Sequence, residues 1–308
     1  MDCEKSVSNR NHGSILQKLI RYVKYFATPL KVFVHRKEYA HILGWQQFYG
    51  LILAFYFQLF KVENAPDITV MTFIYKPKTL PIIGGWYEKF VRYCVTSNYI
   101  KKIIVFSEKE RRHYASLFDV PEEKFVAVRL GVEDTTHRIP SHKPEGYFLA
   151  AGRSNRDYSY LLSVWGDEWQ LKIVCDNLKD ITEKPNIEIL RNCHGDSYLE
   201  LLSKCYAVIV PLSDVYVSSG QLVILQSLMY GKPVIVTEND TVYDYVINGE
   251  DGYVIGKTES ELSTAIKMVD REYEILSRNA KKHFEEKFSL YAMGTEIGNI
   301  LHTQSKLK

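Results

Sequence analysis

The chain has 308 residues, of which 46% are hydrophobic and 25% are charged. This composition is ordinary for a globular protein, and the length suffices for two domains of about 150 residues each. Because 39 basic and 37 acidic residues leave a net charge of only +2, the composition gives no reason to expect a nucleic-acid partner.

The cysteine content and the N-terminal sequence predict a cytoplasmic location. The five cysteines are odd in number and form no Cys-x-x-Cys pair, which is typical of reduced thiols rather than of a disulfide framework. Residues 1–14 are polar and contain no apolar core of a secretory signal. We therefore expect no export.

The first predicted helix, within residues 14–37, is amphipathic and basic. Apolar residues recur at helical spacing, and Lys18, Arg21 and Lys24 are interleaved with them. Such a helix could lie on an anionic membrane surface. It could also turn its apolar side to a protein core and its charged side to water. The sequence therefore leaves a peripheral contact with the inner membrane open.

The rest of the first half alternates short β-rich runs with amphipathic helices. The pattern predicts strands at 41–44, 68–73, 103–107 and 125–128, and helices at 46–60, at 84–98 and from Glu108. The apolar run in the helix at 46–60 is shorter than the ~20 residues that a membrane-spanning helix needs, so we expect a buried helix. Strands alternating with helices predict a parallel sheet.

A second α/β unit follows the polar stretch 133–146, which is the predicted linker. Its strands are expected at 147–151, 171–175, 187–190, 207–210, 233–236 and 252–255, and a long helix at 260–287. This pattern predicts two Rossmann-like, doubly wound domains, 1–143 and 144–287, with the first one shortened. A helix at 288–308 could cross back to the first domain. We expect the domains to face each other across a cleft at the strand carboxyl ends, where open α/β sheets bind ligands.

The most informative stretch, residues 210–237, has the pattern of a strand, a serine-rich turn, a helix and a second strand. Ser218 or Ser219 is a suitable N-cap for the helix. Gly220 allows the backbone to approach a ligand closely, and Gly231 ends the helix. The free N–H groups and the positive dipole end at such a turn suit a diphosphate.

Three segments carry a family resemblance: residues 231–235 (Gly-Lys-Pro-Val-Ile), residues 210–212 (Val-Pro-Leu), and residues 244–254 with their spaced glycines. In this order and spacing, the chain resembles the retaining glycosyltransferases of family four over roughly residues 100–290. The resemblance implies the GT-B fold and a nucleotide diphosphate sugar as donor, bound without a metal cofactor. It also implies retention at the anomeric carbon, by a front-face substitution without a protein nucleophile.

The chain departs from this family at both signature glutamates, where it has Ser218 and Gln226. The resemblance places the first position at the donor sugar and the second at the ribose. An amide both donates and accepts hydrogen bonds, so Gln226 can still hold a ribose. The departure indicates either a variant subgroup or a loss of catalysis. The expected donor-binding residues are Gly152, Ser218, Ser219, Gly220, Gln221, Leu222 and Gln226.

A second match follows the first strand of the C-terminal domain, at residues 152–157 (Gly-Arg-Ser-Asn-Arg-Asp). In the family, a Gly-Arg followed by a lysine binds the donor diphosphate. Arg153 matches the family's arginine, and Arg156 is the candidate for the lysine's role, because a planar guanidinium suits phosphate oxygens. We predict both arginines as the catalytic residues that neutralise charge on the departing nucleotide. The alternative is that Arg156 only pairs with Asp157 at a helix start.

Polar and aromatic residues after the first two strands are the candidates for the acceptor side. Amide and aromatic groups suit sugar hydroxyls and rings, and a lysine there could meet a lipid pyrophosphate or only solvent. The candidates are Gln46, Gln47, Tyr75 and Lys76. No metal site is predicted, because Cys193 and His194 are adjacent but lack partners at metal-ligand spacing.

These features predict a hexosyltransferase that uses a nucleotide diphosphate sugar, most plausibly a UDP-sugar. The predicted acceptor is a glycan or lipid-linked glycan in the synthesis of a bacterial surface polysaccharide such as lipopolysaccharide, O-antigen or capsule. Two alternatives stay open. One is a non-catalytic subunit that binds sugar nucleotides, and the other is a nucleotide-sugar epimerase or phosphorylase of the same fold.

Overall fold

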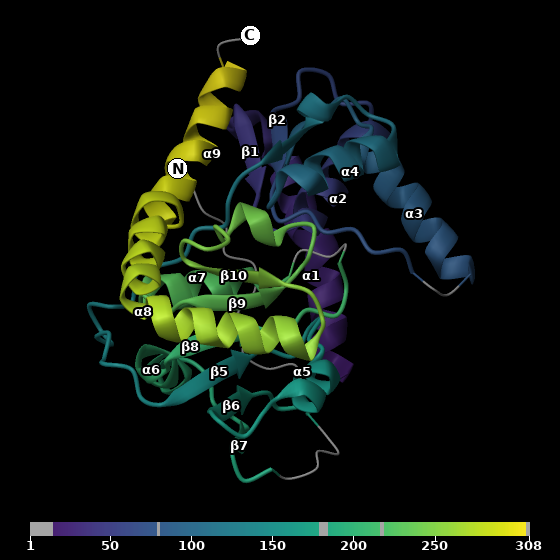
Figure 1. The fold of residues 1–308 in the computed structure, drawn as a ribbon. Helices are drawn as coiled ribbons and strands as arrows, with labels where there is room; N and C mark the ends of the chain where they lie inside the picture. Colours follow the sequence, from purple (N-terminus) through teal and green to yellow (C-terminus); the bar gives the residue numbers. More distant parts are fainter. Residues whose placement is uncertain (1–14, 79–80, 179–183, 216–218, 306–308) are drawn as a thin grey trace. The chain divides into compact units, whose positions relative to one another are not determined.

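The computed structural model describes residues 15–78, 81–178, 184–215 and 219–305 (Figure 1). The chain divides into two compact units, Met1–Ala127 and Val128–Lys308. Each unit is built on a parallel sheet. The predicted α/β class, with two parallel-sheet domains, is therefore confirmed.

The sheet of the first unit has the order β1-β2-β3-β4. The elements of this unit are α1 (Ile15–Val34), η1 (Arg36–Glu38), β1 (His41–Gly44), α2 (Gln47–Leu59), β2 (Asp67–Val70), α3 (Pro81–Val95), β3 (Ile100–Val105), α4 (Glu108–Phe118), η2 (Glu122–Lys124) and β4 (Phe125–Ala127). The strands lie within a few residues of their predicted positions. In the described ranges, no helix is long and apolar enough to cross a membrane.

Aromatic and aliphatic side chains fill the core of the first unit. Phe73, Phe118 and Phe125 are each about 1% exposed, and their rings pack edge to face or stacked. The predicted buried helix is α2, which lies directly on β1. A Cβ added at Gly44 would be only 3.0 Å from the backbone of Gly50 on α2, so glycine is needed for this close packing.

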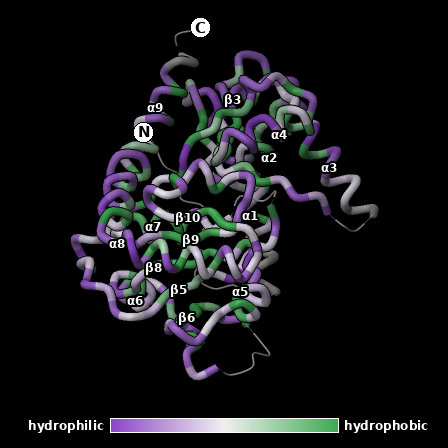
Figure 2. Tube along the Cα trace, viewed as in Figure 1, coloured by the Kyte–Doolittle hydropathy of each residue, from purple (hydrophilic) through white to green (hydrophobic). Residues whose placement is uncertain are grey.

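The second unit carries a six-stranded parallel sheet in the order β10-β9-β8-β5-β6-β7. Its elements are β5 (Tyr147–Ala151), α5 (Tyr158–Val164), β6 (Gln170–Val174), β7 (Ile187–Leu190), α6 (Asp196–Lys204), β8 (Ala207–Val210), α7 (Gln221–Met229), β9 (Val234–Thr237), η3 (Val242–Asp244), β10 (Gly252–Ile255), α8 (Glu259–Lys287) and α9 (Leu290–Ser305). The central strands β5, β8 and β9 are buried throughout and hydrophobic (Figure 2). Continuous apolar strands of this kind are typical of a parallel sheet covered on both faces.

The division between the units falls before the stretch 133–146 that was predicted as the linker. Side chains of this stretch pack on the second unit, where Ile139 is 7% exposed and belongs to the hydrophobic core. The Thr135 hydroxyl lies 3.1 Å from the Tyr230 hydroxyl, and Val132 bridges Ser289. A proline-containing polar stretch thus forms part of the folded second unit. The predicted crossing of the C-terminal helix to the first domain stays a prediction.

Candidate functional site

Two loops meet at the carboxyl ends of β5 and β8, where the second sheet changes direction. The chain leaves β5 toward β6 and β7, and it then returns past β5 to build β8, β9 and β10. Such a switch point is where open parallel sheets bind ligands, because the loops that follow the two strands lead away from each other. Backbone pairing joins the loops: Arg156 bridges Leu212, and the Asp157 N–H donates to the Pro211 carbonyl over 2.8 Å.

Arg156 is fixed between two glycine turns at this point. Its Nε donates to the Ala151 carbonyl over 3.0 Å, and its Nη1 donates to the Ser154 carbonyl over 2.9 Å. A Cβ added at Gly152 would lie 2.9 Å from Nη2, and one added at Gly220 would lie 3.6 Å from it. Both glycines have positive φ angles, 106° and 88°. Glycine therefore permits both the backbone conformation and the close approach of the guanidinium.

Among the described residues, no carboxylate pairs with Arg156. Burial lowers the pKa of the guanidinium, which nevertheless stays protonated at neutral pH. Asp157 pairs with Lys257 instead, with Oδ2 and Nζ 2.8 Å apart, and its Oδ1 accepts from the Tyr160 N–H to cap α5. The alternative in which Arg156 pairs with Asp157 is therefore wrong. Within the described residues, no protein group accepts from Nη2, so this nitrogen can donate to a ligand.

Arg153 lies on the same loop as Arg156 but differs from it in its surroundings. Its side chain is exposed and makes no hydrogen bond or ion pair within the part of the chain that the structure describes. The structure thus places one fixed, half-buried guanidinium and one free, exposed guanidinium on a single short loop. Arg153 can therefore bind an anion held by this loop without first losing a protein partner.

The start of α7 is the second anion-binding element. Gly220 is the N-cap, and no side chain of the described residues caps the helix. The prediction that a serine caps the helix is wrong for Ser219, whose Oγ accepts from Asn155 Nδ2 over 2.6 Å; Ser218 lies outside the described residues. Glycine is required at the cap because a Cβ at Gly220 would lie 2.9 Å from the Val210 side chain. The first-turn N–H groups and the positive end of the helix dipole are therefore left for a ligand.

The other predicted donor-binding residues lie on α7. The Nε2 of Gln221 is buried and has no hydrogen-bond partner among the described residues. Leu222 is 52% exposed. Gln226 is half-buried, and its side chain makes no hydrogen bond to other described residues. Two amides on this helix are thus unpaired in the protein, as expected of groups that recognise a polar ligand.

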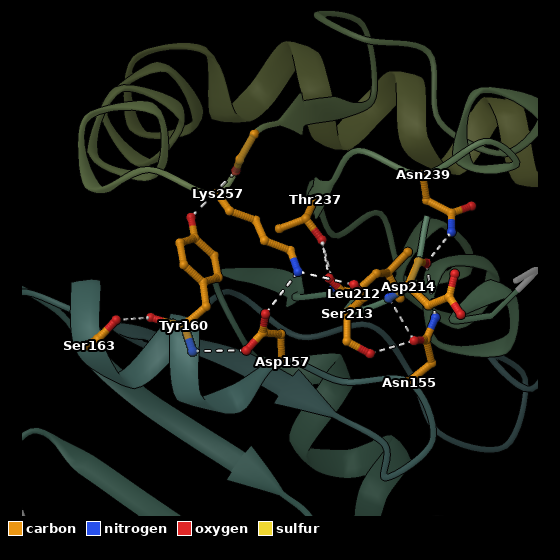
Figure 3. A network of polar contacts seen from close by, with 11 residues as sticks. Asn155, Asp157, Tyr160, Ser163, Leu212, Ser213, Asp214, Thr237, Asn239 and Lys257 are labelled. Atoms are coloured by element: carbon orange, nitrogen blue, oxygen red, sulfur yellow. Dashed lines mark hydrogen bonds and ion pairs between the residues drawn. The ribbon is translucent and has the colours of Figure 1, made fainter. Parts of the chain in front are cut away.

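A polar network joins the loops around the site (Figure 3). Lys257 Nζ bridges Asp157 and the Ser213 carbonyl, at 2.8 and 3.2 Å. Asn239 Nδ2 donates to the Asp214 carbonyl over 2.8 Å, and Asn155 also contacts this loop. Lys257 and Asn239 were not predicted from the sequence, because a loop lysine or asparagine has no periodic pattern. The one available signal was asparagine within the Gly-Arg-Ser-Asn-Arg run, since asparagine tolerates left-handed backbone.

The loop ends after β6 and β7 carry further polar residues that the sequence analysis missed. Asp176 accepts from the Asn192 N–H over 2.8 Å and lies 3.1 Å from His194 Nε2. The Tyr198 hydroxyl on α6 is buried without a hydrogen-bond partner. Burial raises the pKa of Tyr198, while the charge of Arg156 acts in the opposite direction. Among the described residues, no group of three or more His, Cys, Asp or Glu is arranged to hold a metal ion.

Two of the acceptor-side candidates in the first unit are amides that hold the backbone. Gln46 Oε1 accepts from the Phe48 N–H over 3.0 Å and caps α2. The Gln47 amide pairs with Ile74 in both directions, donating to its carbonyl at 3.1 Å and accepting from its N–H at 2.8 Å. These bonds fasten the segments that follow β1 and β2 to each other. Contact of either amide with an acceptor stays a prediction.

The other two candidates differ in exposure. Tyr75 is 8% exposed, and its ring stacks on that of Tyr87 at a centroid distance of 5.7 Å. Lys76 is exposed and makes no hydrogen bond or ion pair within the described ranges. Of the four candidates, Lys76 is therefore the one whose side chain is exposed and has no partner among the described residues.

Comparison with known proteins adds a family match and structural neighbours. Residues 148–270 match the family model described as Glycosyl transferases group 1. No curated protein matches the sequence. Among solved structures, sucrose-phosphate synthase (tll1590) from Thermosynechococcus elongatus has a TM-score of 0.69 at 14% identity, covering 98% of this chain and 82% of that chain.

Two further structures are similar over most of the chain. Alr3699/HepE of Anabaena in complex with UDP has a TM-score of 0.68 at 11% identity and covers 90% of this chain and 82% of its own; the same protein is also known with UDP-glucose. The apo form of the lipopolysaccharide outer core galactosyltransferase WaaB has a TM-score of 0.65 at 11% identity, with 95% and 83% covered. The two parallel-sheet units and these neighbours confirm the GT-B fold. Together with the family match, they support a GT-B glycosyltransferase.

Proposed function

We propose that the protein transfers a hexose from a nucleotide diphosphate sugar to a hydroxyl of a glycan or lipid-linked glycan. The observation that carries the proposal is the setting of Arg156, a fixed cation with a free N–H between Gly152 and Gly220, at the uncapped start of α7. A diphosphate fits this combination, because the guanidinium and the helix dipole meet its charge and their N–H groups donate to its oxygens.

The proposed reaction exchanges one carbon–oxygen bond for another. The bond between the anomeric carbon and the β-phosphate oxygen breaks, and the nucleoside diphosphate leaves with the electron pair. The acceptor hydroxyl oxygen forms the new bond to the same carbon, and its proton passes to the leaving diphosphate. Arg156 and the N–H groups of α7 stabilise the negative charge that develops on the leaving group, and Arg153 adds a second cation. These groups would do what a divalent metal does in other transferases.

The nucleoside is proposed to lie along α7. Gln226 is placed to bind the ribose hydroxyls and Gln221 to bind the sugar or a phosphate, since both amides are unpaired in the protein. UDP is the proposed nucleotide, supported by the UDP and UDP-glucose complexes of the HepE structure. Retention at the anomeric carbon is proposed from the family resemblance, with attack from the face on which the diphosphate leaves.

A peripheral contact with the cytoplasmic face of the inner membrane is proposed for α1. One side of this helix packs on α2, where the Tyr25 and Phe48 rings are 5.6 Å apart. The helix also leaves apolar side chains exposed, by 46 to 64% of their surface: Ile20, Tyr22, Val23, Phe26, Leu30 and Val34. Its charged residues are all basic: Lys18, Arg21, Lys24 and Lys31. Exposed apolar groups among basic ones suit an anionic lipid surface and favour a lipid-linked acceptor of a surface polysaccharide.

A non-catalytic sugar-nucleotide-binding subunit is the second candidate. It is favoured by the residues at the two family signature positions, where Ser218 and Gln226 replace carboxylates. An epimerase or phosphorylase of the same fold is a further alternative. It would convert the nucleotide sugar without any acceptor.

One assay separates these functions. The purified protein is incubated with UDP-, GDP- and ADP-hexoses, with and without a bacterial membrane extract, and the release of nucleoside diphosphate is followed. A transferase releases the nucleoside diphosphate much faster when the extract supplies an acceptor than when it does not. Release of sugar phosphate or formation of an epimeric sugar without extract would indicate the enzymatic alternative. Binding of a donor without turnover under all conditions would indicate the subunit, and absence of binding would refute the proposal.

A further inference from the structure

Asn155 occupies a backbone conformation that most residues avoid. It lies between Arg153 and Arg156, and its φ angle is 56°, in the left-handed region. Asparagine adopts this region more often than most other residues with a Cβ, because its short polar side chain can hydrogen-bond locally. The conformation turns the Asn155 side chain toward the loop that leads from β8 to α7 (Figure 3).

The amide of Asn155 makes four hydrogen bonds to that loop. Its Oδ1 accepts from the Ser213 hydroxyl at 2.5 Å and from the Asp214 N–H at 2.8 Å. Its Nδ2 donates to the Asp214 carbonyl at 3.3 Å and to Ser219 Oγ at 2.6 Å. The donor and acceptor capacity of one side chain is therefore directed at a single partner segment, which indicates a positioning role rather than a chance surface contact.

These bonds reach both ends of the short stretch 216–218. Ser213 and Asp214 precede it, and Ser219 follows it immediately before the N-cap Gly220. Lys257 and Asn239 contact the part of the loop that precedes this stretch, at Ser213 and Asp214 respectively. Asn155 thus joins the start of α7 to the loop that carries both arginines.

We infer that Asn155 is a positioning residue that sets the distance between the two anion-binding parts of the donor site, Arg156 and the first turn of α7. The inference rests on the proposed donor site and deepens it. With the amide present, the guanidinium and the helix N–H groups converge on one diphosphate. Without it, the turn at Ser219 and Gly220 loses this hydrogen bond to the arginine loop, and a ligand contacts the two parts less well together. Asn155 itself need not touch the donor.

The test uses substitutions that separate the side chain from the backbone. Asn155→Gly keeps the left-handed conformation available but removes all four side-chain bonds. Asn155→Asp keeps the acceptor oxygen, loses the donor to the Asp214 carbonyl and to Ser219 Oγ, and adds a negative charge. Asn64→Gly is the matched control, because Asn64 also has a positive φ angle, 52°, and lies in the first unit.

The measurement is the dissociation constant of each full-length variant for UDP and for UMP, by calorimetry, together with its melting temperature. If Asn155 aligns the diphosphate site, Asn155→Gly weakens UDP binding by about tenfold, the equivalent of one to two lost hydrogen bonds. UMP, which has no β-phosphate, loses less, so the preference for UDP over UMP shrinks. A merely structural role would lower the melting temperature without changing this preference. Asn155→Asp should weaken UDP binding at least as much, and Asn64→Gly should leave both constants unchanged.

A double-mutant cycle with Ser219→Ala tests the route of the effect. If Asn155 acts through Ser219, the two substitutions together weaken UDP binding by less than the product of their separate effects. The inference is overturned if the native protein binds UDP and Asn155→Gly keeps both its affinity and its preference over UMP. If the native protein binds none of UDP, GDP or ADP, the proposed function itself has failed, which is a distinguishable result.

Discussion

The guanidinium of Arg156 lies against the backbone of Gly152, so closely that a Cβ on the glycine would stand 2.9 Å from Nη2. Three residues separate Gly152 from Arg156, and the chain between them turns back so that Nε also reaches the Ala151 carbonyl. The proposed diphosphate site depends on this contact, because it holds the cation at the end of the strand.

Gly152→Ala tests that contact. The substitution forces a Cβ onto a residue with φ of 106° and pushes the guanidinium away. We expect a loss of about 1–3 kcal/mol in the free energy of unfolding from the backbone strain, and a nucleoside diphosphate affinity reduced at least tenfold. Both are measured on the purified variant, by denaturant unfolding and by calorimetry. Gly146→Ala is the matched control, since a Cβ there meets nothing within 4 Å; equal nucleotide affinity in the two variants would contradict the placement of Arg156.

Arg153→Ala should affect turnover more than folding. The side chain is exposed and unpaired among the described residues, so its removal costs little stability. As a cation facing the leaving diphosphate, it should be worth roughly 10²–10³ in turnover. The release of UDP from a UDP-hexose in the presence of acceptor extract measures this. Arg278→Ala, which removes an exposed arginine from α8, is the control and should leave turnover unchanged. If Arg153→Ala turns over as fast as the native protein, Arg153 is not part of the site.

Gln226→Ala should weaken nucleotide binding with little effect on stability. The side chain is half-buried and makes no hydrogen bond within the described chain, so nothing in the protein depends on it. Loss of one or two hydrogen bonds to the ribose predicts an affinity for UDP lower by about 5- to 30-fold. Gln226→Glu should bind more tightly than Gln226→Ala, because a carboxylate can accept from ribose hydroxyls. If both variants bind UDP as the native protein does, the ribose lies elsewhere.

The exposed side of α1 can be tested with vesicles. Phe26→Glu places a negative charge among the exposed apolar residues, where Phe26 is 52% exposed. We expect the native protein to float with vesicles that contain anionic lipid and the variant to float several-fold less, while both remain unbound by neutral vesicles at physiological salt. Glu63→Gln, a change elsewhere in the first unit, serves as control. Equal flotation of native protein and Phe26→Glu would refute a membrane role for this face.

Lys124 predicts a pH dependence of stability in the first unit. Burial, reinforced by the nearby charge of Lys101, lowers the pKa of Lys124 from about 10.5 to about 8, while its Nζ donates to the Ser97 carbonyl at 2.5 Å. Between these pH values the unfolded chain binds more protons at this site than the native chain does. The contribution of Lys124 to the free energy of unfolding therefore rises as the pH increases from about 8 to about 10. The difference in free energy of unfolding between the native protein and Lys124→Met should change between about pH 8 and pH 10. A difference that stays constant over this range would contradict the lowered pKa of Lys124.

The strands could be predicted from sequence because their signal is local. Short apolar runs such as residues 147–151 and 207–210 are buried on both faces of a parallel sheet, so hydrophobicity alone marks them as strands. The domain boundary was harder to predict. Proline and charge between 133 and 146 are typical of a linker, but burial of Ile139 against the second unit is a tertiary contact without a local signal.

Part of the candidate site could be predicted from the sequence. Gly152 and Arg156 were identified from the family resemblance and Gly220 from the turn before the helix, and the structure brings these three together. Ser218 or Ser219 was predicted to cap the helix from general preference, but the tight fit at Val210 selects glycine at the cap, and Ser219 pairs with Asn155. The contribution of Asn155 could not be predicted, because its four hydrogen bonds reach residues 213–219, and this contact forms only when both loops are folded.

A crystal structure of the protein with bound UDP tests the central claim most directly. The account predicts the diphosphate within hydrogen-bond distance of Arg156 Nη2 and of the first-turn N–H groups of α7, with the ribose against Gln226. A nucleotide bound with its diphosphate away from both Arg156 and the start of α7 would contradict the proposed donor site.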